Sequence, residues 1–584
     1  MSLPGHTQIQ HSAIRRQLEK IVAHGLFARS ERMGRFLRFA VERTIEGKGD
    51  VLKEYLIGVE VFDRKGSYDP RVDPIVRVEA RRLRSKLKAY YDGDGREDPI
   101  VFEFNTGTYA PAIRERRPAS RVADAGISTV AVLPFTNLSG STEHDYFSDG
   151  LTEELIHALT KLSGMRVVAW NSAARLRGVE QDLEEVRRQL HVGTVLTGSV
   201  RISGTSLRVR AQLIDTQSGV YLWSETFDRR MQEVFAIQEE IARAIVRTLR
   251  VQLAGGTEKL VSRSQTSVRA YDYYLKGRYH WHRRSADDLR RSLQYFEMAI
   301  EADAESALAY AGVADAYTLL VEYGLVHPAE GIPKGKDAAS RAIELDGSLA
   351  EAYPSLALIR SHYDWQWEEA ERLYRKAIAL NPGYATAHHW LGLDCLAMMG
   401  RLEEAKLEME IALQLDPLSS ILYEGRAFVH ILTREYDEAI RRCREIQEFD
   451  PSFYKAYATM GRALSLAGRY PEALEMMEKG RARSGDVPSV LAAIGHVLAL
   501  SGDRTGAQGV LAKLTARASE VHIPATCFAV VQMGLGEDEQ ALDSLEKACD
   551  QRELTLGVLK VHPLYDPLRS HPRYQAILRR LNLA

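Results

Sequence analysis

Cysteine is scarce in this chain of 584 residues. The four cysteines lie far apart and form no CxxC pair: Cys395, Cys443, Cys527 and Cys549. This spacing predicts neither a zinc site nor a disulfide framework, and it is typical of a protein in a reducing compartment. We therefore expect a cytoplasmic protein.

Long apolar runs are missing as well. No run of about 18 apolar residues occurs, so we expect no membrane span. The opening residues, MSLPGHTQIQHS, lack the apolar core of a signal peptide. The composition, with 45% hydrophobic and 27% charged residues, is that of an ordinary globular protein. The length predicts three or more domains, because a single core stops growing near about 250 to 300 residues.

Motifs for catalysis and for metal binding are also absent. The sequence contains no HExxH, no Cys/His ligand spacing and no G-x-S-x-G nucleophile elbow. His388 and His389 are adjacent and would point in different directions on a helix, which argues against a metal. Gly331 to Lys336, GIPKGK, has one residue too few between its glycines for a phosphate loop, and we expect an ordinary loop there. We predict no catalytic residue, no metal and no cofactor, and therefore a protein that is not an enzyme.

Positive charge collects near the start of the chain, although the net charge is only −2. Residues 1 to 113 hold 20 Lys and Arg against 16 Asp and Glu, so the remainder is acidic. The densest stretch is DPIVRVEARRLRSKLKAYY, from Asp73 to Tyr91. Apolar residues recur in it at steps of four and three: Val76, Ala80, Leu83, Leu87 and Tyr90. This spacing predicts a helix with one buried face and basic outer faces.

The segments around this helix predict the rest of a small domain. Three amphipathic helices are expected before it, at Ser12 to His24, Ser30 to Glu46 and Leu52 to Phe62. After it, Pro99 to Asn105 and Thr108 to Ile113 are expected to be strands joined by a tight turn. A basic helix followed by a β-hairpin is the order of elements in a winged helix.

The pattern Val76-x-Val78-x-x-Arg81-Arg82-Leu83-Arg84-x-Lys86-Leu87, with Gly107-Thr108-Tyr109 behind it, resembles the recognition helix and wing of OmpR/PhoB-type effector domains. That family usually opens with a small β-sheet, whereas helices are expected here. The resemblance implies that residues 1–113 form a winged-helix-like domain that binds double-stranded DNA. The residues implied for DNA contact are Arg77, Arg81, Arg82, Arg84, Ser85, Lys88, Thr106, Thr108 and Tyr109. The alternative is an amphipathic helix whose basic face is simply solvated.

A polar linker at 114–128 is followed by a mixed pattern at 129–255. Strands are expected at 129–135, 165–170, 194–202, 207–215 and 220–227. Helices are expected at 148–162, 183–190 and 231–253. This order predicts an α/β sandwich of two or three layers.

Four stretches of that segment resemble the TolB-like amino-terminal domain and its FlgO-like relative. They are VAVLPFTNLS at Val130 to Ser139, YFSDGLTEEL at Tyr146 to Leu155, LTGSVR at Leu196 to Arg201 and LIDTQSGVYLWSETFDR at Leu213 to Arg229. The resemblance implies binding or sensing, not a reaction. In other chains this domain often follows a class III cyclase domain, but no paired metal-binding aspartates occur here. Asp149, Gly150 and Trp223 are interpreted as a helix cap, a turn and a core ring.

The remainder of the chain is periodic. Asp346-Gly347, Asn381-Pro382, Asp416-Pro417 and Asp450-Pro451 recur at intervals of 35, 35 and 34 residues. Small residues recur between them, as in Leu391-Gly392, Ala405, Ala412, Met460-Gly461, Ala473 and Gly480. The pattern resembles the tetratricopeptide repeat, a helical hairpin of about 34 residues. It implies an array of about seven to nine repeats at 268–560, an inserted loop near Tyr323 to Lys334, and a capping helix at 561–584.

These features predict a multidomain chain with a helical winged-helix-like head, an α/β sandwich middle and an all-α tetratricopeptide-repeat solenoid. The expected function is that of a cytoplasmic DNA-binding transcriptional regulator, which docks a protein or peptide in its repeat groove. A homodimer is also expected, because a winged helix usually reads paired half-sites. Two alternatives stay open. One is a scaffold whose basic helix contacts acidic protein or RNA, and the other is an enzyme or nucleotide-cyclase-associated protein acting through 129–255.

Overall fold

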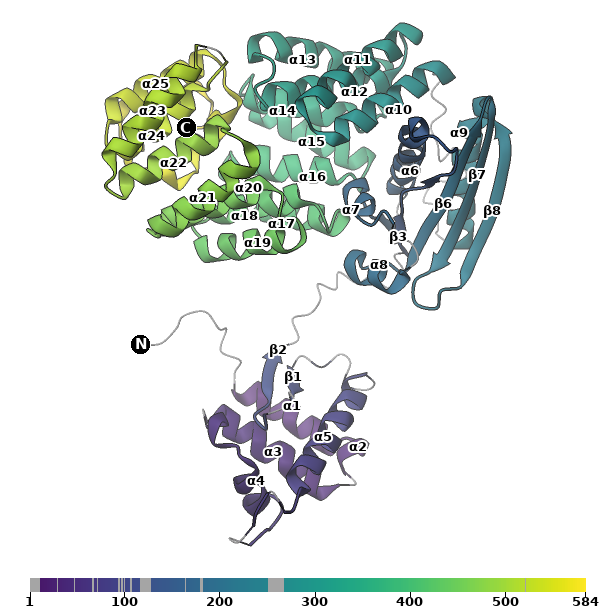
Figure 1. Ribbon diagram of the computed structural model, residues 1–584, viewed down its shortest axis with the longest axis vertical. Coiled ribbons are helices and arrows are strands. Elements are labelled where there is room, and N and C mark those ends of the chain that lie inside the picture. The colour runs from purple at the N-terminus through teal and green to yellow at the C-terminus, as the bar shows by residue number, and fades with distance from the viewer. Residues whose placement is uncertain are drawn as a thin grey trace. The chain divides into compact units, whose positions relative to one another are not determined.

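The computed structural model divides into two compact units, Met1–Ala125 and Gly126–Ala584 (Figure 1). The residues that the structure describes are 11–28, 30–46, 48–65, 68–70, 72–92, 95, 98, 100–104, 108–115, 128–162, 164–178, 182–249, 267–519 and 521–584. Within these ranges no helix is both long enough and apolar enough to cross a membrane.

The first unit consists of helices followed by a β-hairpin. Its elements are α1 (His11–Ala23), α2 (Gly25–Ala28), α3 (Glu31–Ile45), η1 (Gly49–Val51), α4 (Glu54–Glu60), α5 (Ile75–Asp92), β1 (Ile100–Glu103) and β2 (Ala112–Glu115). The two strands pair antiparallel, with Phe102 opposite Ile113. The four predicted helices are present. The second strand begins later than predicted, at Ala112 instead of Thr108.

The core of this unit lies between α5 and the other elements. All five apolar residues predicted for the inner face of α5 are buried, as the helical period required. They join one cluster with Phe36 and Leu37 of α3 and with Phe102 of β1. The packing fixes which face of α5 remains outside.

A buried carboxylate ties this core together. Asp98 is only 2% exposed, and it accepts hydrogen bonds from Tyr90 at 2.6 Å, from Lys20 at 2.5 Å and from Gln17. Burial raises the pKa of Asp98, but the hydrogen bonds from Lys20, Tyr90 and Gln17 outweigh it and leave the pKa below its ordinary value. Asp98 thereby links α1, α5 and the chain that enters the hairpin.

The second unit opens with a six-stranded sheet of order β5-β3-β6-β7-β8, and β4 pairs with β6. The strands are β3 (Ser128–Val132), β4 (Thr136–Asn137), β5 (Met165–Val167), β6 (Thr194–Ser203), β7 (Ser206–Asp215) and β8 (Tyr221–Arg230). The pairs β3–β5, β3–β6 and β4–β6 are parallel, whereas β6, β7 and β8 form an antiparallel meander.

Helices cover both faces of the sheet at its parallel end. The helices are α6 (Asp145–Thr160), α7 (Trp170–Arg175), α8 (Leu183–Leu190) and α9 (Val234–Thr248), with η2 (Thr142–His144) and η3 (Met231–Glu233) as short 3-10 turns. Val130 and Val132 of β3 pack with α6 and α9, whereas Ala131 between them packs with α8 and with Leu176, which follows α7. Successive strand residues point to opposite faces, so this end has three layers. The outer face of β7 and β8 is largely exposed, which leaves two layers there.

Several sequence interpretations of this part were wrong in detail. The strand predicted at 165–170 stops at Val167, and Trp170 begins α7, a helix of only six residues. Asp149 and Gly150 lie inside α6 and are neither cap nor turn, because the helix starts at Asp145. A Cβ at Gly150 would lie 2.6 Å from Leu275, so glycine lets α10 approach closely.

From Val268 onward the chain is a series of antiparallel helix pairs. The helices are α10 (Val268–Arg283), α11 (Ala286–Ala302), α12 (Ala307–Glu322), α13 (Pro328–Leu345), α14 (Ala352–His362), α15 (Trp367–Leu380), α16 (Ala385–Leu391), α17 (Leu402–Leu415), α18 (Ser420–Leu432), α19 (Tyr436–Phe449), α20 (Tyr454–Leu466), α21 (Tyr470–Ser484), α22 (Pro488–Leu500), α23 (Arg504–Arg517), α24 (Ala525–Leu535) and α25 (Asp538–Asp550). A short π-helix, η4 (Gly392–Ala397), continues α16.

The predicted repeat marks fall at equivalent places in these pairs. Asp346, Asn381, Asp416 and Asp450 are the residues that end α13, α15, α17 and α19. Gly461 meets α21 so closely that a Cβ there would lie 2.5 Å from Met477. Small residues at these positions permit the close approach of neighbouring helices that stacking requires. The helical-repeat prediction is confirmed.

One predicted loop is in fact helical. No inserted loop extends to Lys334, because α13 begins at Pro328. GIPKGK, at Gly331 to Lys336, therefore lies within α13 and is not a loop. Pro328 at the first helical position is favourable, since its missing N–H would have no helical acceptor there.

The chain ends by returning to the middle of the array. After η5 (Leu554–Lys560) and η6 (Pro563–Leu568), helix α26 (Pro572–Arg580) lies within the segment predicted to cap the last repeat. Trp367 on α15 donates its indole N–H to the carbonyl of Leu581 at 2.8 Å, and Asn582 donates to the carbonyl of Trp365 at 3.1 Å. Leu583 is 2% exposed in the same cluster. These two hydrogen bonds attach the C-terminal segment to repeats that precede it by about two hundred residues.

Candidate functional site

The outer face of α5 is the site that the basic sequence pattern singles out. Val78, Arg81, Arg82 and Ser85 are all exposed and are spaced so that they share one helix face. Val78 is 43% exposed, although it is apolar. Arg77 lies beside this row and is also exposed. The face therefore combines guanidinium groups, a hydroxyl and an apolar side chain.

The arginines on this face differ in what they contact. Arg82 pairs with Glu79 one turn away at 2.8 Å. Arg77 pairs with Glu54 of α4 at 3.0 Å and donates to the carbonyl of Pro70 at 2.7 Å. Among the described residues, no acceptor is recorded for the guanidinium of Arg81. Arg81 is therefore the best placed of the three to contact an external anion.

Arg84 instead holds the hairpin against the helix. Its Nε donates to the carbonyl of Phe104 at 2.9 Å, and Nη2 lies 3.5 Å from the carbonyl of Thr108. The side chain is only half-buried, but these guanidinium donors face backbone carbonyls of the protein. The DNA contact predicted for Arg84 stays a prediction, and its observed contacts attach α5 to the backbone at Phe104 and Thr108.

Tyr109 is similarly engaged with the protein. Its hydroxyl donates to Glu54 at 2.8 Å, and the same carboxylate binds Arg77. Burial, followed by the hydrogen bond to Glu54, raises the pKa of Tyr109 well above its ordinary value. Thr108 is exposed, and its hydroxyl accepts from the amide of Ala110 at 3.2 Å. Sequence reasoning missed Glu54, which holds both groups from outside the predicted site.

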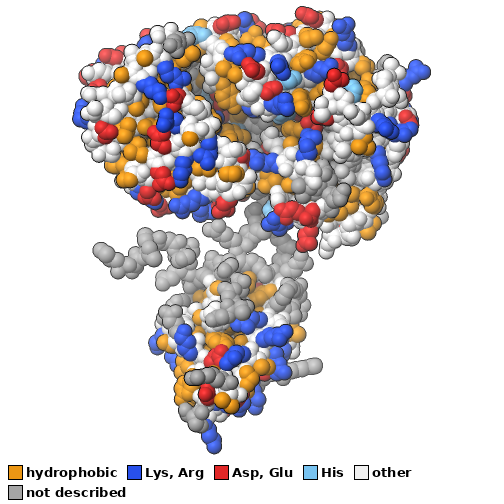
Figure 2. Space-filling model, in the orientation of Figure 1, with side chains coloured by type: hydrophobic (Ala, Val, Ile, Leu, Met, Phe, Trp, Pro, Cys, Tyr) orange, Lys and Arg blue, Asp and Glu red, His pale blue; other side chains and the backbone are white. Residues whose placement is uncertain are grey.

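Two predicted contact residues cannot be placed. The side chain of Lys88 and the whole of Thr106 lie outside the described residues. The neighbouring Lys86 donates to the carbonyl of Leu26 at 2.6 Å, so it helps to attach α5 to α2. On the described surface of the first unit, Figure 2 shows more basic than acidic side chains on the face in view.

The second unit contains a separate, half-open cavity of about 1730 Å³. It is lined by α6 and α7, by helices of the repeat array and by the C-terminal segment, and a hollow is visible among the repeats in Figure 2. Arg462 on its wall is half-buried, and no hydrogen-bond partner of its guanidinium is recorded among the described residues. Aromatic side chains such as Trp390 and Tyr454 also line it.

Three successive repeat turns dock the α/β domain beside this cavity. Asn381 donates to the hydroxyl of Thr160 at 3.1 Å at the end of α6. Asp416 accepts from the amide of Ser172 at 2.9 Å and from its hydroxyl, both on α7. These residues are the repeat marks themselves, so one sequence position ends a helix and also binds the α/β domain.

The third turn adds an ion pair. Asp450 lies 2.5 Å from Arg175 of α7, and Ser420 also donates to Asp450. The ring of Phe449 packs under the same guanidinium at 5.5 Å. Helix α7, which sequence reasoning missed, thus docks on two of these turns. A run of small polar residues between hydrophobic ones, WNSAAR, was its only sequence signal.

Partly buried charges join α6 to the first repeats. Arg278 of α10 lies 2.5 Å from Glu153 and 3.3 Å from Asp315. Burial raises the pKa of Glu153, but the charges of Arg278 and His282 outweigh it and leave that pKa below its ordinary value. Burial, together with the charges of Glu153 and Glu351, raises the pKa of Glu154 to about 8. Glu154 is therefore largely protonated at neutral pH.

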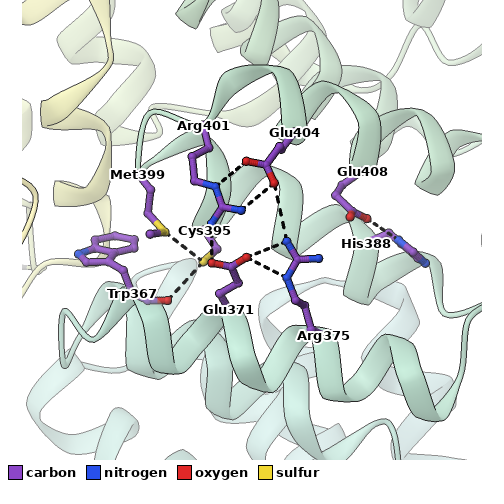
Figure 3. A network of polar contacts seen from close by, with 9 residues as sticks. All are labelled: Trp367, Glu371, Arg375, His388, Cys395, Met399, Arg401, Glu404 and Glu408. Carbon is purple, nitrogen blue, oxygen red and sulfur yellow. Dashed lines mark hydrogen bonds and ion pairs between the residues drawn. The ribbon is translucent and has the colours of Figure 1, made fainter.

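A network of polar contacts joins neighbouring helix pairs in the middle of the array (Figure 3). Arg401 lies 2.5 Å from Glu371 and 2.7 Å from Glu404. Arg375 reaches the same two carboxylates at 2.7 Å and 3.9 Å. Two arginines and two glutamates therefore alternate between α15 and α17. All four side chains are paired with one another, so the arrangement connects adjacent repeats.

The same view accounts for two reactive residue types (Figure 3). Nδ1 of His388 lies 2.7 Å from Glu408 and Nε2 lies 3.1 Å from the carbonyl of Pro382, so both ring nitrogens are engaged. Burial raises the pKa of the Cys395 thiol to about 12, which keeps it protonated and unreactive. Among the described residues no group of three His, Cys, Asp or Glu side chains could hold a metal ion.

Comparison with known proteins identifies one segment. Residues 126–244 match the family described as HilA/YgeH-like transcriptional regulator, second domain. This range covers the sheet and its helices through most of α9.

Curated relatives match over longer stretches. A Rhizobium meliloti protein named "Putative adenylate cyclase 3" is 36% identical over 44% of this chain and 44% of its own length. The transcriptional regulator HilA of Salmonella typhimurium is 22% identical over 55% of this chain and 56% of its own length. The matches therefore span about half the length of these relatives.

A solved structure resembles the repeats. The tetratricopeptide-repeat protein YrrB, described as having an unusual peptide-binding site, is 22% identical and has a TM-score of 0.24; the likeness covers 34% of this chain and 96% of that one. The chain thus combines a segment like the second domain of HilA/YgeH-type transcriptional regulators with a helical repeat array of the tetratricopeptide type.

Proposed function

We propose that this protein is a transcriptional regulator that binds double-stranded DNA through the outer face of α5. The observation that carries the proposal is the composition of that face. It exposes Arg81, Arg82 and Ser85 together with Val78, whereas the opposite face of the helix is buried. Arginine recognises guanine edges and phosphates, and an apolar group can contact the methyl of thymine. The regulator-type segment at 126–244 supports the same function.

The roles within this winged-helix-like head follow from the contacts. Arg81 and Ser85 would face base edges or phosphates, and Arg82 would exchange Glu79 for a phosphate. Thr108 and the predicted contact Thr106 would approach the adjacent backbone. Arg84 and Tyr109 would hold the hairpin in place, as their bonds to Phe104 and Glu54 indicate.

The test is binding of the full chain to genomic duplex fragments over a series of salt concentrations. Arg81→Ala is expected to weaken binding by about tenfold and to reduce discrimination between sequences, since a base-reading arginine contributes about 1 to 3 kcal/mol. Arg82→Ala is expected to weaken all sequences alike and to flatten the salt dependence. Arg16→Ala is the control, because Arg16 is also exposed but lies on α1.

The outcome also separates the alternatives. Unchanged duplex binding by both α5 variants would refute the proposed interface. Preference for RNA, or for an acidic protein, would identify the scaffold function instead. Nucleotide turnover by the full chain with Mg²⁺ or Mn²⁺ would indicate an activity in the α/β domain. Asp145, Asp149 and Glu153 of that domain line the cavity, but among the described residues no group of three His, Cys, Asp or Glu side chains could hold a metal ion.

We further propose that the repeat array docks a protein or peptide segment in the cavity of the second unit, and that the adjoining TolB-like α/β domain senses its occupancy. The cavity is large enough for an extended segment, and it touches both α7 and the inner repeat helices. Arg462 offers a guanidinium to a carboxylate of such a partner. Capture of partners by the full chain and by Arg462→Glu, compared by mass spectrometry, tests this. A partner retained equally by both would contradict a role for Arg462.

A further inference from the structure

Strand β8 is a long edge of the six-stranded sheet. It runs for ten residues, Tyr221–Arg230, and pairs with β7 on one side. Among the described residues no strand pairs with its other side. Edge strands of this length leave a row of backbone donors and acceptors open, and natural proteins usually shorten or cover them. The opposite edge, β5, has only three residues.

The hydrogen-bond pattern shows which backbone groups of β8 are open. The amide of Met231 donates to the carbonyl of Thr205, and the register places Leu207 opposite Arg229. Because inward and outward groups alternate in an antiparallel ladder, the odd-numbered residues from 223 to 231 bond to β7. The even-numbered residues from 224 to 230 therefore direct their N–H and C=O groups away from the sheet.

The side chains of β8 also alternate. Phe227 is buried against the helical layer, and Arg229 lies 3.9 Å from Glu240 of α9, so odd-numbered residues face the helices. The even-numbered residues are exposed on the open face of the sheet. Any strand added to this edge would place its own side chains beside these two rows.

We propose that a second copy of this chain pairs with β8 in antiparallel orientation, about a two-fold axis at Phe227. In this register the outward backbone groups of Thr226 bond to the partner's Asp228, and those of Ser224 bond to the partner's Arg230. On the helix-facing side, Glu225 lies opposite the partner's Arg229. The symmetry repeats that pair, so the edge is complementary to itself in charge.

Neighbouring registers lack this complementarity. A shift by two residues in one direction places Asp228 opposite the partner's Asp228, and like charges directly opposite are destabilising. A shift by two in the other direction leaves Glu225 opposite the buried Phe227. The sequence of β8 thus selects one arrangement.

Exposed apolar residues adjoin the same edge. Val220, Tyr221 and Leu222 are 56%, 60% and 41% exposed, an unusual run for three consecutive apolar side chains. In the proposed register they lie next to the partner's η3. Their burial would add apolar area to an interface that otherwise rests on backbone hydrogen bonds.

The proposal goes beyond DNA binding and does not depend on it. The interface lies wholly in the second unit, so it is measured on the full chain without DNA. A chain that binds DNA but never dimerises would refute this inference and leave the proposed function standing. A chain that dimerises through β8 but does not bind DNA would support this inference and refute the proposed function.

The experiment is sedimentation velocity over a dilution series. The wild type is expected to pass from dimer to monomer on dilution. Glu225→Arg and Arg229→Glu, each alone, place like charges opposite each other twice, and each is expected to weaken dimerisation by about tenfold or more. An equimolar mixture of the two variants restores opposite charges in the mixed dimer and is expected to recover the association. A misfolded variant would not show this recovery.

Two further variants sharpen the result. Thr226→Pro removes an outward N–H but no bond to β7, so it is expected to weaken the dimer while the sheet is retained. Arg201→Glu is the control, since Arg201 is an exposed arginine of β6, two strands from the edge, and its reversal changes the net charge by the same amount. A wild type that stays monomeric throughout, or a dimer indifferent to the Glu225 and Arg229 changes, would overturn the proposal.

Discussion

At the scale of single residues, neighbouring arginines of α5 make different contacts with the rest of the protein. Arg81 has no recorded acceptor among the described residues, whereas Arg84 donates to the carbonyl of Phe104. The periodicity of the sequence identified the outer face correctly, because burial depends on local spacing. It could not identify which arginines are engaged, because Glu54 and Phe104 lie about twenty residues away in sequence on either side.

This difference predicts separable effects of two substitutions. Arg84→Ala is expected to lower the free energy of unfolding by about 1 to 2 kcal/mol, because it removes charged hydrogen bonds to the hairpin. Arg81→Ala is expected to leave stability unchanged and to weaken DNA binding. Thermal unfolding and duplex binding, measured on the same preparations, check this. Equal stability losses in both variants would contradict the assignment of Arg84 as the positioning residue.

Asp98 predicts a dependence of head stability on pH. Its folded pKa is lower than in the unfolded chain, so its contribution is present above the unfolded pKa of about 4 and is lost as the pH falls through the folded value. Asp98→Asn is expected to cost about 1 to 3 kcal/mol at neutral pH. The difference from wild type should shrink in acid below about pH 4. Unfolding followed by tyrosine fluorescence between neutral and acid pH measures it.

At the scale of elements, the repeats were predictable and their docking was not. The spacing of Asp346, Asn381, Asp416 and Asp450 follows from a local rule, since each ends a helix. The partner of Asp416 is Ser172, 244 residues earlier, and no local pattern encodes that contact. Helix α7 was missed because six residues are too few to display helical periodicity.

The docked turn predicts a local effect. Asp416→Ala is expected to free α7 and to raise amide hydrogen exchange at residues 169–176, because the amide and hydroxyl of Ser172 lose their acceptor. Asp346→Ala is the matched control. Asp346 ends α13 in the same way but accepts from Ser348 of its own turn. Equal exchange at α7 in both variants would show that the docking does not depend on Asp416.

Glu154 predicts a second dependence on pH, at the joint between α6 and the first repeats. Its folded pKa of about 8 lies above the unfolded value of about 4.5, so its contribution is complete below the unfolded pKa and is lost as the pH rises toward 8. The wild-type melting temperature of the second unit is expected to fall over that range. Glu154→Gln cannot ionise and is expected to flatten the profile. An unchanged slope in this variant would exclude Glu154 as the cause.

At the scale of the whole molecule, the chain comprises two compact units. The basic helix belongs to the first unit, and the sheet edge and cavity belong to the second. Composition and length predicted several domains, but the α/β segment and the repeats share one unit. One hydrophobic cluster runs from Val130 of β3 to Leu356 of α14, and polar contacts add to it. These contacts join residues too far apart in sequence for a local pattern to reveal, so the sequence alone separated the two parts.

Two units predict two thermal transitions in calorimetry of the full chain. Asp98→Ala is expected to lower the transition of the first unit, and Asp416→Ala that of the second. Each variant should leave the temperature of the other transition unchanged, since distant sites contribute independently. A single cooperative transition shifted by both substitutions would show that the units unfold together.

The return of the C-terminal segment to Trp367 has a practical consequence. Leu583 is buried, and the carbonyl of Leu581 accepts the hydrogen bond from the indole of Trp367. These residues therefore stabilise the packing of α15, about two hundred residues earlier in the chain. A polar or bulky substitution at Leu583 would therefore disturb helices that lie about two hundred residues earlier in the chain. Labels for imaging or capture are better attached to exposed residues away from this cluster.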